Sequence, residues 1–182
     1  MNNGSGNALD GIANIVINGG SLLLSGDNQI VDTANMDLAG GTFDADGNDE
    51  VLGTLTLSSD SSIDLGTTSS ILDFADSSGL ELAWTTSGQL LSILDYTGDT
   101  NGGGIDQIIF NSQGLTDSQL AAIRFVNPWG SGLTIGARWQ GNEIVPVPEP
   151  STYLGAGLIL TLIGWRERRR LQTLIGKFRQ AA

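Results

Sequence analysis

The sequence contains no cysteine and no histidine. Their absence excludes disulfide bonds, thiol nucleophiles, Ser-His and Cys-His catalytic pairs, and zinc sites built from thiolate or imidazole ligands. Basic residues are also scarce, because residues 1–150 hold only Arg124 and Arg138 against 19 acidic residues, a balance of −17. The negative charge of residues 1–150 repels phosphate groups, and we therefore expect no nucleic-acid partner.

The residues that are abundant indicate an all-β protein. Hydrophobic residues make up 40% of the 182 positions, which is enough to fill a core. The 26 glycines, together with many Ser, Thr, Asn and Asp residues, are typical of short strands separated by tight turns.

An internal repeat runs through the first half of the chain. Residues 14–24, NIVINGGSLLL, align with residues 35–45, NMDLAGGTFDA, and residues 53–66 continue the pattern less faithfully. Alternating apolar residues predict strands, and a unit of about 20 residues must stack on its neighbours to bury its apolar face. We therefore predict a parallel β-helix, or β-solenoid, with Leu22, Phe43 and Ile63 close together. A β-sandwich of antiparallel hairpins is the alternative.

The repeat divides the chain into three parts. Residues 1–79 form the repeats, residues 80–144 a terminal β section that caps the solenoid, and residues 145–182 a tail. Within the cap, residues 80–98 give two alternating runs, and Thr116 with Gln119 three positions later predicts a capped helix over residues 116–123. Because no export signal or capping section precedes the first strand, we expect the sequence to be the C-terminal piece of a longer protein.

The tail combines a stiff spacer, an apolar run and an arginine cluster. Pro146, Pro148 and Pro150 form the spacer, and the apolar run reaches from Tyr153 to Trp165. Its 13 residues form a helix of about 20 Å, short of the roughly 30 Å hydrocarbon core unless flanking residues extend it. The aromatic boundaries and the stop-transfer arginines nevertheless predict a short C-terminal transmembrane helix. These arginines are Arg166, Arg168, Arg169 and Arg170.

The order of these features resembles the C-terminal sorting signal of PEP-CTERM proteins of Gram-negative bacteria. The residues that carry the resemblance are Val147, Pro148, Glu149, Pro150, Ser151 and Thr152. The resemblance implies an exosortase that cuts at or near the Pro-Glu-Pro tripeptide, and a precursor anchored in the inner membrane that is then released to the cell surface or extracellular matrix. Residues 171–182 depart from the family's usual ending, while residues 94–125 resemble the end domain before that signal. The Gly-Gly repeats resemble, more loosely, those of autotransporter passengers.

Two acidic stretches have the composition of calcium loops. Asp44, Asp46, Asn48 and Glu50 alternate around a glycine, but without the spacing of an EF-hand or a calcium β-roll. Asp95, Asp99 and Asp106 form a similar group. Asp and Asn are also common turn residues, so we interpret both stretches as turns and expect no cofactor or metal.

The leading hypothesis is a non-enzymatic surface or extracellular-matrix protein. The alternative is a polysaccharide-binding or polysaccharide-degrading β-helix enzyme, with paired carboxyl groups as acid and base. Exopolysaccharide is the ligand to consider in both cases. Trp84, Trp129 and Trp139 could stack on sugars, although burial in the core is the commoner role of such aromatic residues.

Overall fold

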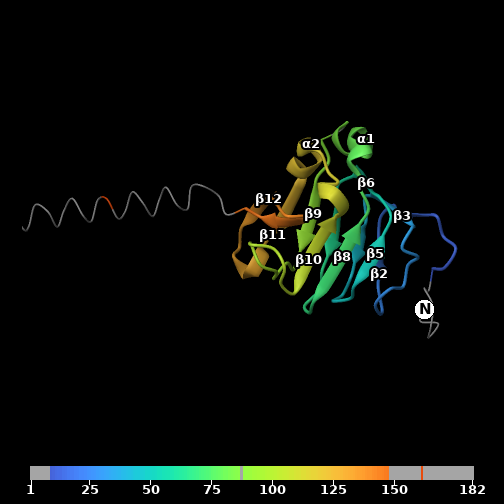
Figure 1. The fold of residues 1–182 in the computed structure, drawn as a ribbon, viewed down its shortest axis with the longest axis horizontal. Helices are drawn as coiled ribbons and strands as arrows, with labels where there is room; N and C mark the ends of the chain where they lie inside the picture. Colours follow the sequence, from blue (N-terminus) through green and yellow to red (C-terminus); the bar gives the residue numbers. More distant parts are fainter. Residues whose placement is uncertain (1–8, 87, 148–160, 162–182) are drawn as a thin grey trace, which may run out of the picture. The chain divides into compact units, whose positions relative to one another are not determined.

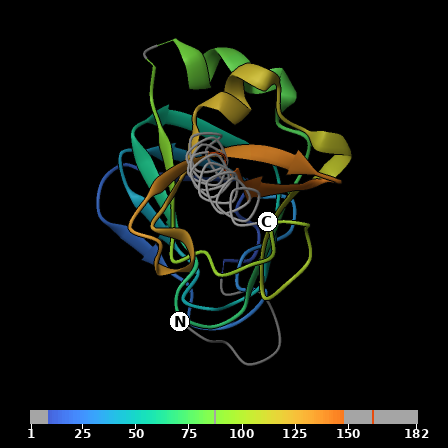
Figure 2. The same ribbon diagram turned by 90° about the vertical axis from the view of Figure 1, so that its left-hand side faces the viewer.

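The computed structural model describes residues 9–86, 88–147 and 161, and within them thirteen short strands surround an apolar core (Figures 1 and 2). The contacts of the chain divide it after Val147, and the fold described here is that of the first unit. The strands are β1 (Asn14–Ile17), β2 (Ser21–Leu23), β3 (Asn35–Ala39), β4 (Thr42–Asp44), β5 (Glu50–Leu52), β6 (Leu55–Ser59), β7 (Ser61–Asp64), β8 (Ser70–Phe74), β9 (Leu91–Leu94), β10 (Asp106–Phe110), β11 (Ile123–Val126), β12 (Thr134–Gln140) and β13 (Glu143–Pro146).

The strands of the repeat region pair in parallel with their sequence equivalents. β1, β3 and β6 form a three-stranded sheet, in which Ile15 lies opposite Met36. A second parallel series runs β2, β4, β7, β9 and β11, and a third runs β5, β8 and β10. The offset between the repeats therefore predicted which strands lie side by side in the first half of the chain.

The prediction of a parallel β-solenoid is nevertheless wrong, because the main sheet is mixed. β12 pairs antiparallel with both β11 and β13, and β13 pairs antiparallel with β10. The two strands thereby join the second and third parallel series into one ten-stranded sheet that curls into a half-barrel. The repeats end before this region, so their spacing gave no information on how the terminal strands would connect the two series.

The core consists of ladders of side chains at equivalent strand positions. Phe43, Ile63, Ile93 and Phe125 are in register on β4, β7, β9 and β11 and are completely buried. Leu22 on β2 extends this ladder as a half-buried residue, so the predicted neighbours Leu22, Phe43 and Ile63 do lie in register. Each fully buried side chain of this size stabilises the fold by about 1.5–3 kcal/mol relative to exposure.

The short helices lie side by side at one end of the sheet (Figures 1 and 2). They are α1 (Glu81–Thr85) and α2 (Asp117–Ala121), and the 3-10 turns are η1 (Ser78–Leu80), η2 (Asn111–Gln113) and η3 (Pro128–Gly130). The predicted helix is confirmed, and its capping box is formed by Thr116 and Gln119. The strand predicted across residues 81–85 is wrong, because this segment forms α1 and buries Trp84, whose Nε1–H donates to the Leu55 carbonyl at 3.2 Å.

No helix within the described residues is long and apolar enough to cross a membrane. The predicted transmembrane segment, Tyr153 to Trp165, lies outside these residues apart from Thr161. The prediction of a short C-terminal transmembrane helix thus has no support, and 13 apolar residues would in any case give a helix of only about 20 Å.

Candidate functional site

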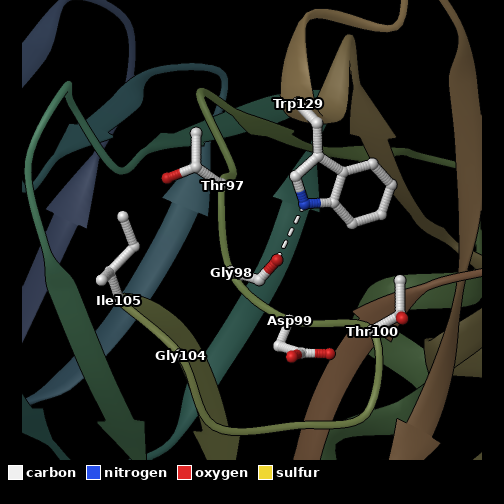
Figure 3. A pocket seen from close by; sticks show the side chains of 7 residues that line it. All are labelled: Thr97, Gly98, Asp99, Thr100, Gly104, Ile105 and Trp129. Atoms are coloured by element: carbon white, nitrogen blue, oxygen red, sulfur yellow. Dashed lines mark hydrogen bonds between the residues drawn. The ribbon is translucent and has the colours of Figure 1, made fainter.

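A shallow hollow lies beside the loop between β9 and β10, and its volume is about 470 Å³ (Figure 3). Its lining combines one indole ring, one aliphatic side chain, two threonines, a carboxyl group and glycine backbone. These residues are Thr97, Gly98, Asp99, Thr100, Gly104, Ile105 and Trp129. The mixture of apolar faces and hydrogen-bonding groups is typical of sites for small polar ligands.

Trp129 is held in place although 41% of its surface is exposed. Its Nε1–H donates to the Gly98 carbonyl at 2.8 Å (Figure 3). Its ring packs edge-on against Tyr96 at a centroid distance of 5.9 Å. Both Asn127 and Trp129 have left-handed backbone conformations, with φ of 53°. Asparagine adopts this conformation readily, whereas it is uncommon for a bulky residue such as tryptophan, so the backbone of Trp129 is held in it by the surrounding contacts.

The loop that forms the floor of the hollow is fixed by Asp106. Oδ2 of this buried carboxylate accepts from the Thr97 N–H at 2.6 Å and from the Thr97 hydroxyl at 2.7 Å. Oδ1 accepts from the Ser70 N–H at 3.2 Å. At Gly98, any Cβ atom would collide with the Asp106 carbonyl and the Tyr96 hydroxyl, so only glycine fits there. These contacts hold the first residues of the loop, Thr97 and Gly98, in place.

A second hollow of about 260 Å³ is also lined by Trp129. It shares Thr97 and Trp129 with the first hollow, and its remaining lining residues are Gly66, Thr67, Asp95, Tyr96, Asn127 and Gly130. Trp129 therefore borders two polar depressions.

The acidic groups beneath this surface serve the fold. The Glu143 side chain is 5% exposed, and its Oε2 accepts from the Gly103 N–H at 2.6 Å. Burial raises the pKa of Glu143, while the Gly103 hydrogen bond lowers it. Burial also raises the pKa of Tyr96 far above its ordinary value, and the neighbouring carboxyl groups of Glu143, Asp106 and Asp99 add to that shift. Tyr96 is therefore a neutral phenol at all physiological pH values.

The first stretch with the composition of a calcium loop does not bring its oxygen atoms together. Asp44 Oδ1 accepts from the Asp46 N–H at 3.1 Å, and the Asn48 amide donates to the Ala45 carbonyl at 2.8 Å. Glu50 is buried and turns to the backbone of residues 29 and 30. Asp44, Asp46 and Asn48 thus lie in or beside a turn, whereas Glu50 lies inside the fold.

The second acidic stretch is also separated by the structure. Asp95 and Asp99 are exposed, whereas Asp106 is completely buried. Asp99 Oδ1 accepts from the Asn101 N–H at 2.8 Å within the loop. Across the described residues, no group of three or more Asp or Glu side chains is arranged to hold a metal ion.

The three tryptophans named from the sequence have different positions. Trp84 is completely buried, and Trp139 is half-buried with its ring edge-on to Phe110 at 6.4 Å. Only Trp129 of the three lines one of the hollows described above. Sequence analysis identified Trp129 as a candidate but missed Thr97, Thr100 and Ile105, because hydroxyl and aliphatic residues in a glycine-rich loop carry no distinctive signal.

The tail begins where β13 ends. Pro146 closes that strand, and the Val147 N–H donates to the Gly136 carbonyl at 2.9 Å. Of the predicted sorting residues, Val147 alone is described, and residues 148–152 lie outside the described part, as do the aromatic boundary residues and the arginine cluster. The cut proposed at or near residues 148–150 would thus fall directly after the last strand.

Residues 146–170 match the family model of the PEP-CTERM protein-sorting motif. The chain carries a PEP-CTERM sorting signal. The signal indicates exosortase-dependent sorting of an envelope, surface or extracellular protein, and it covers the tail rather than the sheet. No curated protein and no solved structure matches the chain. The resemblance to autotransporter passenger repeats thus has no support from these comparisons.

Proposed function

We propose that the chain is a non-enzymatic surface or extracellular-matrix protein that an exosortase processes at its PEP-CTERM signal. The match of residues 146–170 to the sorting motif carries this proposal. The β unit is the part that remains after processing. It is strongly acidic, because residues 1–150 have a net charge of −17, whereas residues 151–182 carry six basic residues against Glu167.

The buried glutamates Glu50 and Glu143 are not placed to act as an acid and base pair, which agrees with a non-enzymatic role. The side chains of Glu50 and Glu143 are 1% and 5% exposed, and each accepts backbone N–H groups. A general acid or base must lie within hydrogen-bonding reach of its substrate. We therefore favour binding over the polysaccharide-degrading alternative, and the exposed hollow beside Trp129 is the observation that keeps polysaccharide binding as a candidate activity.

Processing is tested in an exosortase-containing host, with the chain supplied with an export signal. We expect the surface fraction to lack the residues that follow roughly Pro150, which intact-mass measurement detects directly. Changing Glu149 and Pro150 to Ala should leave the full-length form, because the tripeptide is the proposed recognition element. Glu167→Ala is the matched control, since it removes an acidic residue of the matched segment outside the tripeptide and should still be processed. Surface protein that retains residues 151–182 would contradict the proposal.

A further inference from the structure

The two hollows flanking Trp129 combine an exposed aromatic face with hydroxyl, carboxyl and peptide groups. We propose that they form a binding site for a neutral, hydroxyl-rich saccharide chain. Saccharides have the matching character, because their C–H faces are apolar and their edges carry hydroxyl groups. This inference does not rest on the sorting proposal, since binding by the purified chain requires no exosortase.

The indole supplies the apolar face of the site. Its single N–H is already used by the Gly98 carbonyl, so the ring offers a ligand its π surface rather than a hydrogen bond. Tyr96 and the left-handed turn at residues 127–129 fix the ring before binding. Little conformational entropy is then lost when a sugar ring packs against it. Ile105, with 53% of its surface exposed, adds a second apolar contact in the larger hollow.

The polar groups around the indole suit hydroxyl ligands. Asp99 in one hollow and Asp95 in the other are exposed carboxyl groups, and a carboxylate accepts strong hydrogen bonds from hydroxyl donors. Thr97 lines both hollows and Thr100 lines the first. A ligand that contacts Trp129 and reaches into both hollows can therefore meet a carboxylate in each of them.

The charge of the site selects neutral saccharides over anionic ones. Neither hollow is lined by a basic residue, and each contains an aspartate. Arg138 lines neither hollow, and its guanidinium donates to the Thr100 carbonyl at 2.6 Å and to the Gln140 amide oxygen at 2.9 Å. A uronate carboxylate would face both Asp95 and Asp99, and the single positive charge of Arg138 does not offset these two groups within a body whose net charge is −17.

Affinity electrophoresis of the purified full chain tests the site. The gels contain one of three neutral polymers, hydroxyethylcellulose, glycogen or galactomannan, or one of two anionic polymers, alginate or polygalacturonate. We expect at least one neutral polymer to retard the protein and neither anionic polymer to do so. Trp129→Ala should weaken that retardation at least ten-fold, whereas Trp129→Phe, which keeps an aromatic face, should retain a measurable part of it.

Two further variants separate binding from folding. Leu82→Ala removes an exposed apolar residue that lines neither hollow and should bind as the unchanged protein does. Replacing both Asp95 and Asp99 by Asn should reduce the discrimination against polygalacturonate, because the repelling charges are gone. The proposal is overturned if no neutral polymer retards the protein. It is also overturned if a Trp129→Ala variant with unchanged circular dichroism is retarded by the neutral polymer as strongly as the Trp129→Phe and Leu82→Ala variants are.

Discussion

At the scale of single residues, Glu50 is the clearest case of a group whose charge opposes folding. Its Oε2 accepts the N–H groups of Gln29 at 2.7 Å and Ile30 at 3.2 Å, whereas its buried Oε1 finds no hydrogen-bond partner among the described residues. Burial raises its pKa from 4.5 to about 7, although the two N–H donors act in the opposite direction. The folded protein thus retains a proton that the unfolded chain releases.

Changing Glu50 to Gln should therefore stabilise the protein at neutral and alkaline pH. The folded state binds more protons than the unfolded state between pH 4.5 and about 7, so the Glu50 contribution to stability falls as the pH rises through this window. A glutamine retains an oxygen for the N–H groups without the buried charge. We expect Glu50→Gln to raise the free energy of unfolding at pH 8 by about 1–3 kcal/mol, with little difference at pH 4.

Urea denaturation of both proteins between pH 4 and pH 8 measures this difference. The informative quantity is the gap between the two stability curves, because other buried carboxyl groups, such as Glu143, shift both curves in the same direction. A gap that stays constant across the range would show that the ionisation of Glu50 is not linked to folding.

At the scale of elements, α2 illustrates a local signal that decides a structure. The Thr116 hydroxyl accepts from the Gln119 N–H at 3.3 Å, and the Gln119 side chain accepts from the Thr116 N–H at 2.8 Å. Gln119 is also buried, and its amide donates to the Ser77 carbonyl at 2.9 Å. One glutamine thus caps the helix and connects it to the turn before η1.

Substitutions in the capping box should differ in their cost. Thr116→Ala removes a helix cap and should lower the free energy of unfolding by about 1 kcal/mol. Gln119→Ala removes the acceptor of the Thr116 N–H and one of the two donors to the Ser77 carbonyl, which keeps the Leu80 N–H, and should cost about 2 kcal/mol. Thr116→Ser is the matched control, because it keeps the hydroxyl. Chemical denaturation provides the three values, and equal losses for the two alanine variants would contradict the distinction.

Sequence reasoning succeeded where the local pattern and the tertiary environment agreed. The Thr116 and Gln119 pair predicted α2, and the spacing of the repeats predicted the register of Phe43 with Ile63. It failed at α1, because the alternation of residues 80–85 favours a strand while the burial of Trp84 against β6 accompanies a helix. The exposure of Trp129 could not be predicted either, since it depends on the left-handed backbone of η3.

At the scale of the whole molecule, the sequence did not predict that β12 and β13 connect the second and third parallel series of strands. The seven-residue strand β12 makes this connection. Its partners follow from long-range packing, because the first half of β12 pairs with β11 and the second half with β13. A periodic pattern specifies which face of a strand is buried but not the direction of its neighbours.

The charge of the processed protein also acts at this scale. Residues 1–150 have a net charge of −17, so their acidic groups repel one another in the folded state, and dissolved salt screens that repulsion. Raising sodium chloride from about 20 mM to about 300 mM should therefore raise the Tm of the processed form by a few degrees. Differential scanning calorimetry measures the change, and potassium chloride is the control for a sodium-specific effect. A Tm that falls with added salt would contradict the expectation.

The fixed indole of Trp129 gives the molecule an optical label at its own surface. Trp84 is sealed from solvent, so its fluorescence should be blue-shifted and insensitive to dissolved quenchers, whereas Trp129 is open to them. Quenching of Trp129 should also depend on the charge of the quencher, because the aspartates in the two hollows attract caesium ions and repel iodide ions. In the processed form of a Trp139→Phe variant, which lacks Trp165 as well, a comparison of the two quenchers thus reports the local electric field beside Trp129 without any attached dye.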